Sequence, residues 1–275
     1  MKSGVRVFLS VSITLLLFAF HPNGDSRTIR IQSKDTSISA IFDELRIKTE
    51  KLFEAKKDSF SYEGNNSVEG NNGYIYSIVK VGNLFNKYDR HALIAYSLDA
   101  HTLYVEVRQL IGKVWVKRFR NTSGTKDLES TADPVTLEDL NGDGIPEIFI
   151  AKELALPAHL IRGDVWAMTK DGVQKWTGFD QIENPGYDPK EKQIVGHFIA
   201  GMGLSMSFGS YELNKNHEII PVKSVFCDCT LAKGDSCLVT IDKEKPRKVL
   251  HSQVYKYVPA YFSKEVQKAV SGGKQ

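Results

Sequence analysis

Oxygen-bearing side chains recur at every second position in one short stretch of the chain, at Asp139, Asn141 and Asp143. A glycine follows the third of them and allows a sharp turn, and the carboxylate of Glu147 comes three residues after that glycine. Calcium takes about six to eight oxygen ligands, from side chains and backbone carbonyls. The spacing therefore predicts a Ca2+ loop in which these four side chains bind together with the backbone carbonyl of Ile145.

Two other interpretations of this stretch compete with the calcium loop. An EF-hand would place its bidentate glutamate at the twelfth position from Asp139, which is Ile150, and would need flanking helices. The flanks Val135–Glu138 and Ile148–Ala151 have the composition of strands, so an EF-hand is disfavoured. A polar turn that joins two strands without a metal is the second alternative. Such a turn rarely needs four aligned oxygen donors, which favours calcium.

The N-terminus has the order of a secretory signal. Lys2 and Arg6 precede an apolar run over Val7–Phe20, and the polar, turn-prone segment His21–Ser26 follows. An uncleaved membrane anchor is the alternative, but the run has 14 residues, whereas a spanning helix needs about 20. We expect residues 1–26 to be a signal peptide. The protein would then be periplasmic or secreted, with no stable membrane anchor.

Charge disfavours nucleic acid as a partner. The formal net charge of the whole chain is +3, and removal of Lys2 and Arg6 with the signal lowers it to +1. A near-neutral domain lacks the basic footprint that phosphate binding requires. Basic residues do cluster over residues 113–120, but they alternate with apolar ones and are typical of a solvated strand face.

Three cysteines lie close together near the C-terminus, at Cys227, Cys229 and Cys237. In an oxidising compartment we expect Cys237 to form a disulfide with Cys227 or Cys229, leaving one thiol free. Zinc bound by these cysteines with His217 or His251 is the alternative. The absent Cys-x-x-Cys spacing and the export signal disfavour it.

Composition and hydrophobic periodicity divide the chain into an N-terminal part, residues 27–73, and a larger part, residues 74–275. Apolar residues over Ile38–Phe53 fall on one side of a helix, which predicts an N-terminal amphipathic helix. The run Glu63–Gly73 is rich in asparagine and glycine and has one apolar residue, so we expect an exposed mobile loop there.

From Tyr74 onward the sequence predicts short strands joined by tight turns. Ser252–Val258 is the last predicted strand, and Ser263–Val270 is a predicted terminal helix capped at Ser263. The predicted fold class is all-β, an antiparallel meander. The other strands are expected over residues 74–80, 92–98, 103–110, 114–119, 135–138, 148–151, 164–168, 173–176, 193–200, 205–212, 218–226 and 237–241.

The sequence shows no convincing catalytic constellation, so we expect that the protein is not an enzyme. Ser205 lacks the glycine that a serine elbow needs two residues later, and the histidines show no metal-ligand spacing with one another. Asp180, Glu183 and Asp188 share one loop and in principle offer an acid-base carboxylate pair, although such loops are usually solvated.

The 16 residues Val135–Ile150 resemble the FG-GAP or VCBS-type repeats of calcium-bound β-propellers, in which a loop of this pattern links two strands. The export signal, the single mid-chain loop and a tyrosine-rich later segment are also similar to secreted bacterial proteins with one such loop in a degenerate β-propeller-like domain. Some of those proteins inhibit wall-degrading effectors. The chain lacks the lipidation cysteine that some members carry.

The resemblance implies a degenerate propeller and a function in binding another protein. We expect a periplasmic, calcium-stabilised protein whose partner is a cell-wall hydrolase, acting as an inhibitor or immunity protein against a peptidoglycan-degrading effector. A carbohydrate or cell-wall binding module is one alternative, which exposed Trp115, Trp166 or Trp176 would favour. A hydrolase with an unrecognised site is the other.

Overall fold

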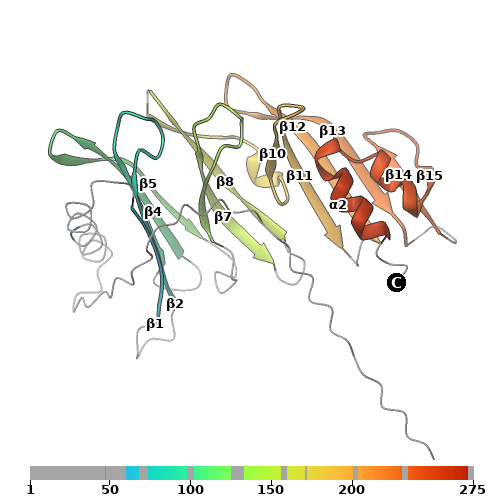
Figure 1. Cartoon of the computed structure of the whole chain (residues 1–275), viewed down its shortest axis with the longest axis horizontal. Helices are drawn as coiled ribbons and strands as arrows, with labels where there is room; N and C mark the ends of the chain where they lie inside the picture. Colours follow the sequence, from blue (N-terminus) through green and yellow to red (C-terminus); the bar gives the residue numbers. More distant parts are fainter. Residues whose placement is uncertain are drawn as a thin grey trace, which may run out of the picture.

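Three antiparallel sheets follow one another along the chain (Figure 1). The computed structural model describes residues 47, 60–67, 74–97, 102–124, 133–155, 160–170, 172–200, 204–230 and 235–271. Within these ranges, neighbouring strands of every sheet are also neighbours in sequence, so each sheet is a meander. The predicted all-β antiparallel meander is therefore confirmed.

The first sheet contains five strands and has a central strand that is buried on both faces. All seven residues of its third strand are buried, which is why His91–Ser97 is almost continuously apolar. The tight turn at Gly112, with φ of 62°, joins the last two strands. The strands are β1 (Phe60–Ser67), β2 (Tyr74–Gly82), β3 (His91–Ser97), β4 (Thr102–Ile111) and β5 (Val114–Gly124).

The second sheet has four strands and includes the predicted calcium loop between its first two. Val135 pairs with Ile150 and Glu138 with Glu147, so the loop closes a hairpin. This sheet consists of β6 (Val135–Glu138), β7 (Glu147–Ala155), β8 (Leu160–Thr169) and β9 (Gly172–Lys175).

The third sheet has six strands and carries the C-terminal helix on one face. A 3-10 turn, η1 (Phe179–Gln181), leads into it, and η3 (His251–Lys256) and α2 (Ala260–Ser271) follow it. Figure 1 shows α2 lying against the strands of this sheet. The strands are β10 (Gly186–Asp188), β11 (Gln193–Ala200), β12 (Ser205–Leu213), β13 (Ile219–Asp228), β14 (Ser236–Ile241) and β15 (Arg247–Leu250).

Among the described residues, three hydrophobic cores hold these layers together. The first lies between the first and second sheets, where Leu93 and Val105 meet Ile148 and Ile150. The second joins the second sheet to the start of the third through Phe149, Phe179 and Ile194. The third lies between the last sheet and α2. Successive sheets therefore pack on one another in chain order, which gives the loop between β6 and β7 a rigid support.

Two predictions for the C-terminal region are wrong. Ser252–Lys256 lies in the helical turn η3 instead of a strand, and α2 begins at Ala260 instead of Ser263. Val254 of η3 and Phe262 and Val266 of α2 are buried in the third core, and the four-residue spacing of Phe262 and Val266 places them on one face of α2. Ser263 lies inside the helix, and its hydroxyl donates to the carbonyl oxygens of Tyr255 and Pro259.

The predicted mobile loop is wrong over its first residues. Glu63–Ser67 belongs to β1, where Glu63 pairs with Ile78 and Ser67 with Tyr74. Backbone pairing with β2 overrides the low strand preference of the asparagines and glycine there. Residues 68–73 lie outside the described residues, as do the predicted signal peptide and the predicted helix over Ile38–Phe53 apart from Ile47, which is helical.

Candidate metal site

The predicted calcium loop is held at both ends by paired strands. β6 ends at Glu138 and β7 begins at Glu147, and these two residues face each other in the ladder. Leu140 is buried in the second core and fixes the start of the loop from inside. The polar side chains of the loop thus start from a hairpin whose position the core determines.

Hydrogen bonds turn the loop side chains inward. The two carboxylate oxygens of Asp139 accept the N–H groups of Gly142 and Gly144, at 2.7 and 2.9 Å. The Oδ1 atom of Asn141 accepts the N–H of Asp143 at 2.8 Å. These bonds curl the backbone around the side chains at alternate positions. Ile145 lies in the same curl, where its N–H donates to Oδ1 of Asp143 at 2.7 Å.

Glu147 brings a buried carboxylate to this loop. Its side chain is 2% exposed, and its Oε2 accepts the N–H of Leu140 at 2.8 Å. The pKa of Glu147 is raised to about 7, mainly by burial and also by the charges of Asp143 and Asp139, while the hydrogen bond from Leu140 opposes the rise. No lysine or arginine forms an ion pair with Glu147 within the described ranges. Asp139, Asp143 and Glu147 thus place negative charge around the loop, which a cation would offset.

The donor set fits calcium in chemistry, although the carboxylates are more widely spaced than in a closed shell. Nδ2 of Asn141 lies 3.1 Å from Oδ2 of Asp143 and 3.0 Å from Oε1 of Glu147. An amide hydrogen-bond donor therefore sits between two carboxylates, where an ion would interact with both. Calcium–oxygen distances of about 2.4 Å place opposite ligands at most about 4.8 Å apart. Among the described residues, the groups of three possible ligands within 4.8 Å of one another do not include Asp139, Asp143 and Glu147.

Tyr187 covers the loop from the third sheet, a contact that the sequence analysis missed. A Cβ atom on Gly142 would lie 2.1 Å from the Tyr187 hydroxyl oxygen, and Gly142 has a φ of 76°. Only glycine combines that backbone conformation with the close approach of the ring. The two residues lie in different sheets, and no local pattern in either segment indicates the contact.

The structure assigns the disulfide to Cys229 and Cys237. Asp228 pairs with Leu238 in the ladder, so the next two residues, Cys229 and Cys237, face each other across β13 and β14. Cys227 is a free, buried thiol. Burial raises its pKa to about 12. The predicted bond from Cys237 is confirmed, and its partner is Cys229.

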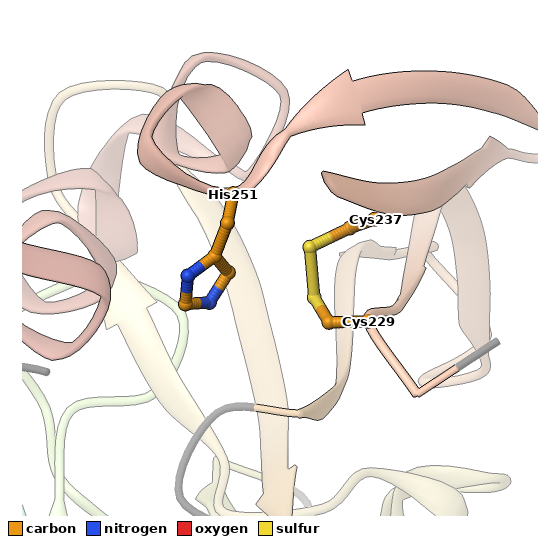
Figure 2. A group of neighbouring side chains, drawn as sticks. All are labelled: Cys229, Cys237 and His251. Carbon is orange, nitrogen blue, oxygen red and sulfur yellow. A yellow bond between two sulfur atoms is a disulfide. The ribbon is translucent and has the colours of Figure 1, made fainter. Parts of the chain in front are cut away.

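Of the two histidines considered as zinc ligands, His251 lies at the disulfide and His217 does not. The ligand atoms of Cys229, Cys237 and His251 all lie within 4.8 Å of one another. Figure 2 shows the imidazole ring of His251 facing the two bonded sulfurs. His217 sits in the turn before β13, where its carbonyl oxygen accepts the N–H of Thr177. Because disulfide sulfurs are not thiolates, the oxidised group is not a zinc site.

The loop carboxylates considered as an acid-base pair have separate structural partners. Glu183 forms an ion pair with Arg162 and accepts a hydrogen bond from Ser207. Asp188 is buried, and its Oδ1 accepts the N–H groups of Lys190 and Glu191. Glu183 and Asp188 therefore each have ion-pair or hydrogen-bond partners within the fold.

The tryptophans do not form an exposed aromatic platform in the second sheet. Trp176 is 1% exposed and packs against Phe179. Trp166 packs against Phe119, with ring centroids 5.0 Å apart, and Lys175 lies over its ring. Both rings therefore contribute to packing between layers.

No helix within the described part of the chain is long and apolar enough to cross a membrane. The fold and site define an all-β chain with one disulfide and one candidate calcium loop. No family model matches it, and no curated protein matches it significantly. A solved structure described as a Xanthomonas type IV secretion system related protein is similar, with a TM-score of 0.39 and 11% identity, over 69% of this chain and 99% of that chain. A likeness at this level supports no inference about function.

Proposed function

We propose that this chain is an exported, calcium-stabilised protein that acts by binding another protein rather than by catalysis. The predicted signal supports export, and the Cys229–Cys237 disulfide is typical of an oxidising compartment. The buried Glu147 carboxylate, close to Asp143 and without a cationic partner in the described residues, supports calcium at the loop.

The observation that supports protein binding is the exposure of two large apolar side chains on one face of the third sheet. Val225 and Val249 are buried in the core under α2, and side chains alternate along a strand. Their neighbours Phe226 and Leu250 therefore point to the opposite face, where they are 46% and 53% exposed. They lie on β13 and β15, on either side of β14, so the partner that we propose would contact this face across three strands.

The partner that we propose is a peptidoglycan hydrolase, so that the protein is an inhibitor or immunity protein. Export places the protein in the compartment of such enzymes, and the calcium-loop resemblance includes proteins with that function. A wall-binding module is the second candidate, but Trp166 and Trp176 are used in packing, which removes two of the three aromatic residues that favoured it.

We also propose that the three sheets are successive blades of a degenerate β-propeller. Each sheet is a meander, and neighbouring sheets share a core, as successive blades do. The calcium loop would then lie within one blade, between its first two strands.

Inhibition assays test the proposed function. The protein, in millimolar calcium, is added to a purified muramidase, an amidase and an endopeptidase acting on peptidoglycan, and hydrolysis is followed by loss of turbidity. We expect inhibition of one class, and we expect Phe226→Asp to weaken it. Val114→Asp is the matched control, because Val114 is an exposed strand residue of the first sheet.

Two results would contradict the proposal. Co-sedimentation of the protein with peptidoglycan, without inhibition of any hydrolase, would favour the wall-binding alternative. Equal loss of inhibition in Val114→Asp and Phe226→Asp would remove the third sheet as the binding surface.

A further inference from the structure

The C-terminal strands bring two cysteines and a histidine to one end of the third sheet. Cys229 directly follows β13, and Cys237 lies opposite it in β14. Cys237 pairs with Val249 of β15, and His251 begins η3 just beyond that strand. The N–H of His251 donates to the carbonyl oxygen of Asp235 at 3.1 Å, which ties η3 to the start of β14. Three consecutive strands thus hold this group in place.

His251 has an unmet hydrogen-bonding requirement at this position. Its Nε2 atom is buried and has no hydrogen-bond partner among the described residues. Buried polar atoms without partners are rare in folded proteins, since leaving them unpaired costs free energy. Figure 2 shows the imidazole ring of His251 beside the Cys229–Cys237 disulfide. A ligand that accepts the nitrogen lone pair would meet this requirement.

We propose that reduction of the Cys229–Cys237 disulfide converts this group into a zinc site with Cys229, Cys237 and His251 as ligands. The proposal is independent of the proposed function and of the calcium loop. Zinc binds cysteine thiolates and imidazole nitrogens in tetrahedral sites. At zinc–ligand distances of about 2.0 to 2.3 Å, neighbouring ligand atoms lie less than about 4 Å apart. In the oxidised protein the ligand atoms of Cys229, Cys237 and His251 lie within 4.8 Å of one another, which is close to that spacing.

The chemistry balances with an external reductant. A dithiol transfers two electrons and two protons to the disulfide, the sulfur–sulfur bond breaks, and the dithiol becomes a disulfide. A phosphine supplies the two electrons instead, and one water supplies the two protons. The oxygen of that water ends in the phosphine oxide. Zinc then displaces the two thiol protons and accepts the lone pair of neutral His251. Water fills the fourth position, because Cys229 and His251 are both partly exposed.

Cys227 is not a member of this site. It lies in β13, two residues before Cys229, and its sulfur is not part of the group within 4.8 Å. Burial raises its pKa to about 12, which favours the neutral thiol. Cys227 therefore provides an internal control for a thiol outside the site.

Zinc uptake by the full chain tests the proposal. The disulfide-bonded protein and the protein reduced anaerobically with a phosphine are titrated with zinc against a chromophoric chelator, in millimolar calcium to occupy the loop. We expect the reduced protein to bind about one zinc per chain and the oxidised protein to bind none with comparable affinity. Cobalt in place of zinc should give the absorption of a tetrahedral thiolate–imidazole site in the wild-type chain, without any substitution.

Matched variants separate the ligands from their neighbours. His251→Ala should weaken zinc binding by more than the roughly 10- to 100-fold that loss of an outer-shell partner costs, whereas its disulfide should still form under oxidising conditions. Cys227→Ala should bind zinc like the wild type. His217→Asn should also bind like the wild type, and asparagine suits the positive φ of that turn position.

Four outcomes would overturn the proposal. The reduced wild type could take up no zinc, or the oxidised protein could bind it as tightly as the reduced one. Unchanged affinity in His251→Ala would show that the imidazole is not a ligand. A cobalt spectrum without thiolate charge-transfer absorption would likewise place the metal elsewhere.

Discussion

The hydroxyl of Tyr187, in the third sheet, lies directly over Gly142 in the calcium loop of the second sheet. A Cβ atom at Gly142 would approach it to 2.1 Å, whereas a Cβ at Gly144 would meet nothing within 4 Å. Both glycines have a positive φ, of 76° and 84°. A comparison of substitutions at Gly142 and Gly144 therefore separates the effect of backbone conformation from the effect of a contact between sheets.

Gly142→Ala should destabilise the fold more than Gly144→Ala. Each substitution introduces the left-handed strain of about 1–2 kcal/mol that a side chain brings, and Gly142→Ala adds the collision with Tyr187. Urea unfolding of both variants measures the difference. In a Tyr187→Ala background the difference should shrink, because the ring is gone. An equal cost at both glycines in the wild-type background would show that the ring moves aside freely.

Removal of calcium should lower the melting temperature. Binding to the folded state alone adds about 2.7 kcal/mol at a hundredfold excess over Kd. Asp143→Ala should lower the melting temperature similarly and abolish the response to added calcium, and magnesium should replace calcium poorly because it demands tighter octahedral geometry. Scanning calorimetry in EGTA and in millimolar calcium makes the comparison. Identical wild-type curves would mean that the loop is only a turn.

Glu147→Gln should have opposite effects with and without calcium. Glutamine keeps the shape of the side chain and removes a buried charge close to Asp139 and Asp143. In EGTA the variant should therefore be at least as stable as the wild type. In millimolar calcium it should be less stable, because it loses a charged ligand. Glu138→Gln, at the facing position in β6, is the control and should keep the wild-type calcium response.

Acid below about pH 6.5 should remove stability contributed by His91, which is buried, and by His197, which is half-buried. Burial lowers the pKa of His197 and of His91, opposed for His197 by Glu265 and Glu183 and for His91 by Asp89. The unfolded state then binds protons first as the pH falls through 6.5. The stability that these two neutral histidines contribute is fully present above pH 6.5. It is lost progressively as the pH falls from 6.5 to their lower pKa values in the folded protein. Urea unfolding at several pH values in calcium should show this slope.

The variant His197→Gln isolates one of the two histidines. His197 packs on Phe262 of α2, with ring centroids 4.6 Å apart. Its protonation should therefore weaken the docking of that helix, and the variant should lose less stability than the wild type between pH 7 and pH 5.5. The same slope in both proteins would exclude His197 as a source of the acid effect.

Cys227 should resist alkylation in the native protein. It is fully buried, and burial raises its pKa to about 12, so the reactive thiolate is scarce at pH 8. Iodoacetamide followed by mass spectrometry should label no cysteine natively and one after unfolding without reduction. Labelling of Cys229 or Cys237 without reduction would contradict the disulfide.

Local patterns were sufficient to predict most strands and the loop. Val135–Glu138 and Gln193–Ala200 form strands with the predicted bounds. Alternating apolar residues and tight turns act over a few residues, so they are visible in the chain itself. The C-terminal turn was misread because Val254 and Val258 fit a strand locally, whereas both pack into the third core together with Phe262 of α2.

Sequence alone determined the all-β class, the alternating oxygen donors of Asp139, Asn141 and Asp143, and the cysteine cluster, because each depends on residue type and short-range spacing. Tertiary structure alone decided which cysteine pairs with Cys237, since that depends on the register of β13 and β14. It also decided that Tyr187 covers Gly142. Contacts between sheets depend on how whole layers pack, and layer packing is set by three cores assembled from distant segments.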